Sequence, residues 1–167
     1  MLFRSSEGMA RHFKNKKPYS LRGDAISGYG IYANRDILKG EVVFRGEEKP
    51  QRIATRTHIE TKWDDDEKEN FKKYAYPISE HVYLLWDENP SSWGPQNHSC
   101  AANTCYEGLD VVAVRAISKG EELTLDYGAF LDDTMQPFQC SCGQSGCRGL
   151  ISGVQGNSIS YRESLRK

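Results

Sequence analysis

The sequence lacks any long hydrophobic run, and this absence removes two classes of protein from consideration. No apolar stretch approaches the roughly 20 residues that a membrane-spanning helix needs. The N-terminal stretch MLFRSSEGMARHFKNKKP has no apolar core of the kind that a secretory signal carries. We therefore expect an intracellular protein, cytoplasmic or nuclear, that makes no contact with a membrane.

The chain also lacks an excess of charge of either sign. It holds 22 basic and 23 acidic side chains in 167 residues, which gives a formal net charge of −1. Because a general nucleic-acid binder concentrates positive charge, a nucleic-acid partner is not required. Residues 1–19 are nevertheless rich in basic side chains, and we expect them to form a basic, weakly ordered arm. Asp64–Glu67 is acidic, and a solvated helix face is favoured there over a site that attracts a basic peptide.

Long periodic helices are scarce, and short strands bounded by turn residues dominate the pattern. We expect a mainly β fold, since strands alternating with long helices are missing. The length suits one domain, which we place at 20–130, followed by a cysteine-rich segment at 131–150 and a loose tail at 151–167. The predicted strands are 31–33, 41–44, 81–86, 103–106, 110–116 and 121–127, and the one predicted helical segment is 53–76.

Two short motifs have conventional explanations that we weigh first. The pattern Arg-x-Ile-x-Lys-Gly-Glu occurs at 35–41 and again at 115–121, and we interpret it as two similar turns because the flanking residues do not match. The stretch GYGIYA at 28–33 satisfies the dinucleotide-binding fingerprint G-x-G-x-x-A. That fingerprint requires a helix after the glycines, whereas a strand is predicted here. Gly28 and Gly30 therefore indicate backbone that packs closely on something else.

Five cysteines in a protein of reducing compartments favour metal binding over disulfides. Cys140, Cys142 and Cys147 form C-x-C-x4-C, and zinc prefers four ligands in a closed structural site. The fourth ligand must come from elsewhere. Cys100 and Cys105 both remain open on residue types alone, with His98 as a weaker competitor, and the unused cysteine is expected in the core of a strand.

Three motifs in order then resemble the SET-domain protein lysine methyltransferases: N-H-S-C at 97–100, E-E-L-T-L-D-Y at 121–127 and the post-SET pattern C-x-C-x4-C at 140–147. The resemblance covers about residues 20 to 150. It implies a SET-domain fold of several small β-sheets around a knot-like crossing, with one short helical insertion and a C-terminal zinc-binding segment. It also implies S-adenosylmethionine as the cofactor, a structural zinc ion, and a protein or peptide substrate with a target lysine, of which a histone tail is one candidate.

The resemblance assigns roles residue by residue. The catalytic residue is Tyr127, and the substrate channel is formed by Phe44, Leu125 and Tyr127. The implied zinc ligands are Cys100, Cys140, Cys142 and Cys147, so that Cys105 is left over. The implied cofactor-binding residues are Gly28, Tyr29, Gly30, Tyr83, Asn97, His98 and Phe138.

The chemistry explains why such a site needs a hydroxyl group. Methyl transfer from a sulfonium requires a neutral amine, although free lysine has a pKa of about 10.4. An apolar channel and the sulfonium charge both disfavour the ammonium form, so no dedicated carboxylate base is required. Alignment is required, and we expect the Tyr127 hydroxyl to provide it.

Two departures from the family pattern lie in the channel. Phe44 stands where a tyrosine is usual, which removes one hydroxyl group. Leu125 stands where many members have an aromatic residue that limits the number of methyl groups, so we expect methylation beyond the first methyl.

Two alternatives belong to other functional classes: a catalytically silent SET module that binds or scaffolds, and a small zinc-binding interaction protein. The latter does not explain E-E-L-T-L-D-Y.

Overall fold

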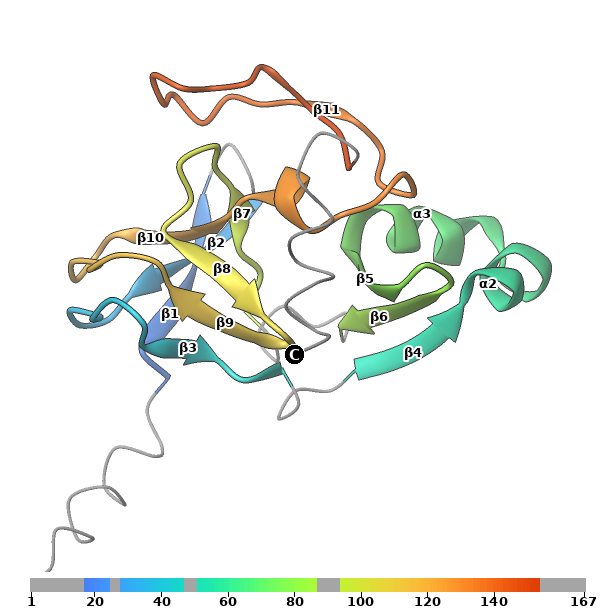
Figure 1. Ribbon diagram of the computed structural model, residues 1–167, viewed down its shortest axis with the longest axis horizontal. Coiled ribbons are helices and arrows are strands. Elements are labelled where there is room, and N and C mark those ends of the chain that lie inside the picture. Colours follow the sequence, from blue (N-terminus) through green and yellow to red (C-terminus); the bar gives the residue numbers. More distant parts are fainter. Residues whose placement is uncertain (1–16, 25–27, 47–50, 87–93, 154–167) are drawn as a thin grey trace, which may run out of the picture.

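In the computed structural model the chain forms four small β-sheets, and the structure describes residues 17–24, 28–46, 51–86 and 94–153 (Figure 1). The mainly β fold expected from the sequence is confirmed. Most of the predicted basic arm and most of the predicted tail lie outside the described residues. The proposed domain boundaries stay predictions.

The first sheet contains the contact that organises the molecule. Its order is β1 (Tyr19–Asp24), β2 (Gly28–Ala33), β10 (Glu122–Leu125) and β7 (Asn97–His98). All its pairings are antiparallel except that of β10 with β7, which is parallel and places Thr124 opposite Asn97 and Leu125 opposite His98. Two segments that are distant in the sequence therefore lie side by side.

The second sheet has the order β3 (Val42–Phe44), β9 (Asp110–Ala113) and β8 (Thr104–Glu107). The two similar turns join it to the first sheet. Ile37 and Ile117 face each other and exchange two backbone hydrogen bonds of 2.9 Å. Each turn also carries an ion pair between its arginine and its glutamate. The strand before each turn pairs with the strand after the other turn, so that β2 pairs with β10 and β9 pairs with β3.

The single helical segment predicted at 53–76 is wrong in its extent. The structure has two helices, α2 (Arg56–Lys62) and α3 (Asp65–Tyr74), between β4 (Gln51–Thr55) and β5 (Ala75–Ser79). The third sheet, in the order β4-β6-β5, includes β6 (Val82–Trp86). Strand pairing of Ile53 with Leu84 removes the start of the predicted helix, and new N-caps at Thr55 and Asp64 divide the remainder.

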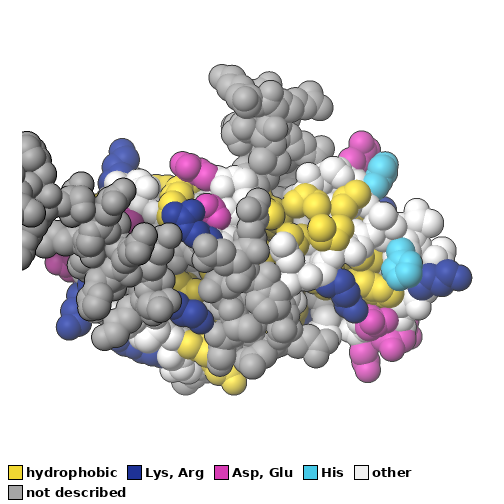
Figure 2. Space-filling view, turned by 90° about the horizontal axis from the view of Figure 1, so that it is seen from below, with side chains coloured by type: hydrophobic (Ala, Val, Ile, Leu, Met, Phe, Trp, Pro, Cys, Tyr) yellow, Lys and Arg dark blue, Asp and Glu magenta, His cyan; other side chains and the backbone are white. Residues whose placement is uncertain are grey.

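The acidic stretch has a local structural role. Asp64 and Glu67 form a capping box, in which the Asp64 carboxylate accepts from the Glu67 N–H at 2.8 Å. Glu67 also pairs with Arg52 at 3.6 Å. Figure 2 shows carboxylates and Lys or Arg side chains close together at the end of the molecule built by the helices. This mixture of charges agrees with the favoured interpretation of a solvated helix face.

Three apolar clusters hold these parts together. The largest lies between the first two sheets and contains Ile31, Ile37, Ile117 and Leu123. The second lies beneath the two helices and contains Ile59, Trp63, Phe71, Tyr83 and Leu85, among others. The third consists of Leu131, Met135 and Ile151.

The third cluster lies where the last elements of the chain meet. These elements are the short 3₁₀ helix η2 (Tyr127–Ala129) and the fourth sheet, formed by β11 (Phe138–Gln139) and β12 (Leu150–Ile151). Within the described ranges, no helix is long and apolar enough to cross a membrane.

Candidate functional site

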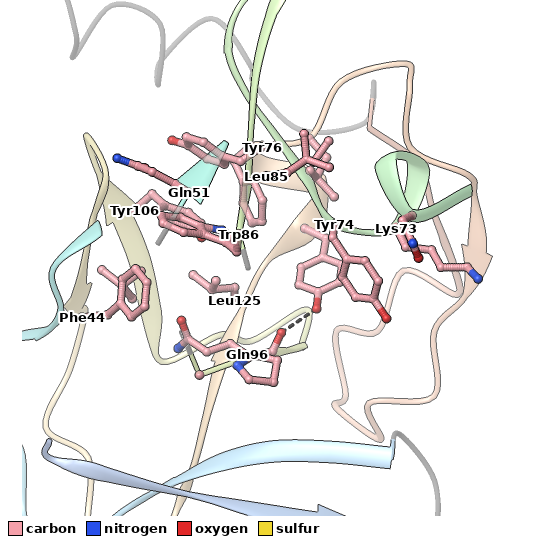
Figure 3. A pocket seen from close by; sticks show the side chains of 18 of the residues that line it. Phe44, Gln51, Lys73, Tyr74, Tyr76, Leu85, Trp86, Gln96, Tyr106 and Leu125 are labelled. Atoms are coloured by element: carbon pink, nitrogen blue, oxygen red, sulfur yellow. Dashed lines mark hydrogen bonds between the residues drawn. The ribbon is translucent and has the colours of Figure 1, made fainter. Parts of the chain in front are cut away.

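A cavity of about 800 Å³ lies between helix α3, the paired strands β7 and β10, and η2 (Figure 3). Five residues that the sequence marked as cofactor or channel residues line it together: Tyr29, Phe44, Asn97, Leu125 and Tyr127. They come from β2, β3, β7, β10 and η2, so no single element defines the site.

Tyr127 reaches the cavity wall because the chain turns sharply at the end of β10. Asp126 caps η2 by accepting from the Gly128 N–H at 3.1 Å. The Tyr127 hydroxyl donates to the backbone carbonyl of Gln96 at 2.5 Å, the hydrogen bond drawn at Gln96 in Figure 3. Burial raises the pKa of Tyr127 well above its ordinary value of 10. The hydroxyl therefore stays protonated at neutral pH, with its oxygen still able to accept a hydrogen bond.

His98 joins this tyrosine to the cysteines. Its Nδ1 accepts from the Tyr127 N–H at 3.1 Å, and its Nε2 lies 3.4 Å from the Cys100 sulfur. Burial lowers the pKa of His98, so the neutral ring is favoured and Nε2 carries the proton. The His98 side chain is thus engaged between the two groups, and it is not among the residues that line the cavity.

The two glycines of β2 are needed for different reasons. Gly28 has a φ of +81°, which favours glycine, and a Cβ there would meet nothing within 4 Å. At Gly30 a Cβ would lie 2.6 Å from Glu122 Oε1 and 3.0 Å from Asn97 Nδ2. The Asn97 amide donates to the Tyr29 carbonyl at 2.9 Å and to the Glu122 carboxylate at 2.8 Å. A larger residue at position 30 would therefore have to displace the Glu122 carboxylate or the Asn97 amide.

Tyr83 and Phe138 are not among the residues that line the cavity. Tyr83 is fully buried in the second cluster, with its ring edge-on to Phe71 at 4.9 Å. Phe138 packs edge-on against His98 at 5.5 Å between ring centroids. The structure thus brings neither residue to the cavity, and their cofactor roles stay predictions.

Several aromatic residues of the cavity were missed by the sequence analysis. Phe44 packs edge-on against Trp86 at 5.2 Å, and Figure 3 shows Trp86 beside Tyr106 and above Leu125. A hydrogen bond with Trp86 lowers the pKa of Tyr106, but burial has the larger effect and raises this pKa above its ordinary value. Tyr74, Tyr76 and Phe130 complete the set. The only signal in the sequence was aromatic residues in short strands, which an ordinary core shares.

The four cysteines named by the resemblance come together, and Cys105 does not join them. The sulfurs of Cys100, Cys140, Cys142 and Cys147 all lie within 4.8 Å of one another. The Cys100 and Cys140 sulfurs are 3.8 Å apart. Ligand atoms at about 2.3 Å from a tetrahedral zinc ion are separated by about 3.8 Å, so the donor set fits this metal. Cys105 lies in strand β8 as expected, but it is half-buried, so the expectation that it belongs to the core is wrong.

Comparison with known proteins agrees with this geometry. The SET domain family model matches residues 28–128, which confirms the resemblance and includes the motifs at 97–100 and 121–127; the cysteine motif at 140–147 lies beyond the match. The histone-lysine N-methyltransferase, H3 lysine-4 specific, of Aspergillus oryzae is 27% identical over 155 residues, covering 83% of this chain and 12% of that protein. Human histone-lysine N-methyltransferase 2D is 31% identical over 138 residues, covering 74% of this chain and 2% of that protein.

A solved structure from Plasmodium falciparum covers 67% of this chain and 94% of its own, with a TM-score of 0.47 and 20% identity. In contrast, this chain spans only a small part of the length of the curated relatives, 12% of the fungal protein and 2% of the human protein.

The crowding at Gly30 generates a prediction. We expect Gly30→Ala to displace the Asn97 amide from Glu122 and to lower the unfolding free energy by about 1–3 kcal/mol, in the range for lost buried polar contacts and overpacking. Chemical denaturation measures this loss. Gly146→Ala is the matched control, because its Cβ would meet nothing within 4 Å and its φ is not positive. Equal stability of the two variants would contradict the explanation.

Proposed function

The chain belongs to the SET domain family, and from that premise we propose that it is an S-adenosylmethionine-dependent protein-lysine N-methyltransferase. The observation that carries the proposal is the hydroxyl of Tyr127 at the wall of an aromatic cavity, held by the carbonyl of Gln96. A hydroxyl placed at the end of an apolar channel is what amine alignment requires.

The cavity is suited to S-adenosylmethionine in size and lining. Its volume of about 800 Å³ falls within the usual range of small-molecule sites. Tyr29 and Asn97, which line the cavity, would hold the cofactor on the side of β2 and β7. The backbone of Gly28 and Gly30 would assist from beside Tyr29, although neither glycine is among the lining residues. We also propose His98 and Phe138 as cofactor-binding residues, although neither lines the cavity. Tyr83 is not retained in this role, because it is fully buried and its hydroxyl is bound to Asp132. When bound, the cofactor supplies a methyl group made electrophilic by a positively charged sulfur.

The walls of the cavity favour the reactive form of the substrate. Phe44, Trp86 and Leu125 present apolar surface, and each is less than 10% exposed. Desolvation among such groups lowers the pKa of a lysine amine from about 10.4, so the proton is lost to water as the side chain enters. The neutral amine then carries the lone pair that attacks the methyl group.

Tyr127 aligns this lone pair. Because its hydroxyl proton is directed to the Gln96 carbonyl, the lone pairs of its oxygen remain to accept an N–H of the amine. One N–H fixed in this way sets the direction of the nitrogen lone pair. Tyr127 therefore acts by orientation and by stabilising the charge that develops on nitrogen, without changing its own protonation state.

We propose a structural zinc ion at Cys100, Cys140, Cys142 and Cys147, supported by the sulfur cluster and its tetrahedral spacing. An all-cysteine site is closed and takes no part in methyl transfer. The ion would tie the C-terminal segment to the N-H-S-C segment, next to the cavity.

The substrate is proposed to be a protein or peptide with a target lysine. Relatives described as histone-lysine methyltransferases support a histone tail as the first candidate, and the expected intracellular, cytoplasmic or nuclear location follows that proposal. A catalytically silent module is not favoured, because Asn97, His98 and Tyr127 all lie at or beside one cavity. An array of histone and non-histone peptides, assayed for transfer of labelled methyl groups, identifies the substrate.

The role of Tyr127 is tested by removing one oxygen atom. We expect Tyr127→Phe to lower kcat by about 10²–10³-fold, the usual effect of losing one catalytic hydrogen-bonding group. Tyr32→Phe is the matched control, since this tyrosine lies on β2 and outside the cavity lining. Radiometric methyl transfer measures both variants. Unchanged kcat in Tyr127→Phe would refute the assignment.

The zinc proposal is tested by metal analysis. We expect one zinc ion per chain in the purified protein, and its loss in Cys142→Ser with a lower melting temperature, because metal binding contributes directly to folding. Cys105→Ser should retain the ion, because this sulfur is outside the cluster. A full complement of zinc in Cys142→Ser would exclude the proposed ligand set.

The methylation state is proposed to exceed one methyl group, because Leu125 occupies less of the cavity than an aromatic side chain. Leu125→Phe should then shift the products toward monomethyl-lysine, since the added ring fills space that successive methyl groups need. Mass spectrometry of the peptide product gives the distribution. Monomethyl product alone, unchanged by the substitution, would overturn this proposal.

A further inference from the structure

The buried hydroxyl of Tyr83 joins two parts of the chain that are distant in the sequence. It donates to Asp132 Oδ2 at 3.0 Å. It also accepts from Arg56 Nη2 at 2.6 Å and from Arg56 Nε at 3.2 Å. Arg56 is the first residue of α2, Tyr83 lies in β6, and Asp132 follows η2. The hydroxyl thus links the helical segment to the chain that leads from Tyr127 toward the cysteines.

Asp132 organises that part of the chain with its other oxygen. Asp132 Oδ1 accepts from the Thr134 N–H at 2.9 Å and from the Thr134 hydroxyl at 2.6 Å. The Asp132 carbonyl accepts from the Met135 N–H at 3.2 Å. One carboxylate therefore fixes the turn at 132–135 and also anchors it to Tyr83.

The turn directly adjoins the wall of the cavity. Leu131 lines the cavity, and its N–H donates to the Tyr127 carbonyl at 3.0 Å. Leu131 also packs with Met135 and Ile151 in the third cluster, against which Cys100 and Cys140 lie. A displacement of Asp132 would consequently move Leu131, which borders both the cavity and the cysteine cluster.

Arg56 adds an electrostatic attraction to the contact between Tyr83 and Asp132. Its guanidinium lies 3.9 Å from Asp132 Oδ2 and 3.2 Å from Asp133 Oδ1. The Asp132 side chain is only 12% exposed, so its interaction with Tyr83 and Arg56 is screened less than a surface pair. Tyr83 provides the hydrogen bond that a buried carboxylate needs.

We infer that Arg56, Tyr83 and Asp132 form a latch, and that Tyr83 is a positioning residue which holds the cavity wall at Leu131 against the helical segment. This inference rests on the proposed function for its effect on the cofactor. It assigns to Tyr83 a role different from the direct cofactor contact implied by family resemblance. Tyr83 acts on the site through Asp132 and the turn, and it touches neither the cofactor nor the substrate.

Tyr83→Phe tests the latch, because it removes the hydroxyl and keeps the ring packed on Phe71. We expect calorimetry to show about tenfold weaker binding of S-adenosylmethionine, which corresponds to about 1.4 kcal/mol. Hydrogen exchange at residues 131–135 should become faster, while kcat at saturating cofactor stays within about twofold of the wild type. Asp132→Asn should have a similar effect, and the double variant should add little, since both changes break one contact.

Ile59→Val is the matched control for a general loss of stability. Ile59 is buried in the same cluster as Tyr83 but makes no contact with Asp132 in the described interactions. It should lower the melting temperature while leaving cofactor affinity and exchange at 131–135 unchanged. Equal loss of affinity in Ile59→Val and Tyr83→Phe would overturn the inference, as would unchanged affinity and exchange in Tyr83→Phe.

The two proposals fail in different ways. If the wild-type protein binds no S-adenosylmethionine, the proposed function is refuted, and hydrogen exchange at 131–135 still decides whether the latch exists. If the wild-type protein binds the cofactor and Tyr83→Phe binds it equally well with unchanged exchange, the proposed function stands and the latch is refuted.

Discussion

The parallel pairing of β7 (Asn97–His98) with β10 (Glu122–Leu125) is the contact on which the rest of the site depends. It extends over two residue pairs and continues in the hydrogen bond from the Ser99 N–H to the Leu125 carbonyl at 3.0 Å. This pairing places Asn97 to donate a hydrogen bond to β2 and His98 to accept one from Tyr127. It also brings Cys100, two residues further on, to the C-terminal cysteines.

A pairing this short needs support from side chains, because two residue pairs alone hold little. Asn103 is 2% exposed, and its side chain bonds to the backbone of β10 as a neighbouring strand would. Its amide oxygen accepts from the Thr124 N–H, and its amide NH₂ donates to the Glu122 carbonyl. Thr104 donates to the Thr124 carbonyl at 2.7 Å, and Gln96 donates to the Thr104 hydroxyl at 2.9 Å. Buried polar groups that satisfy one another in this way specify a single arrangement of the crossing. The same Gln96 accepts from the hydroxyl of Tyr127, so fold and chemistry share one network.

The family and the cysteine cluster were predictable because their signals are local or carried by motifs. Three cysteines within eight residues can surround one ion whatever the rest of the chain does. The choice of Cys100 over Cys105 needed either the family resemblance or the structure. The helical segment was misjudged for a different reason: the spacing of Ile53 fits a helix, but its pairing with Leu84 across a sheet is a tertiary contact that overrides the local preference.

The sequence by itself determined the strands β2, β3, β6, β8, β9 and β10, the two similar turns, the three ordered motifs and the ligand type of the cysteine site, but not β1, β4 or β5. These depend on periodicity and spacing, which act over a few residues. Only the tertiary structure decided that Trp86 and Tyr106 line a cavity and that Tyr83 lies outside its lining, bound to Asp132. A buried aromatic residue has the same local pattern in a core and at a site. The difference arises from which distant segments pack around it, and that packing is fixed here by the crossing of β7 and β10.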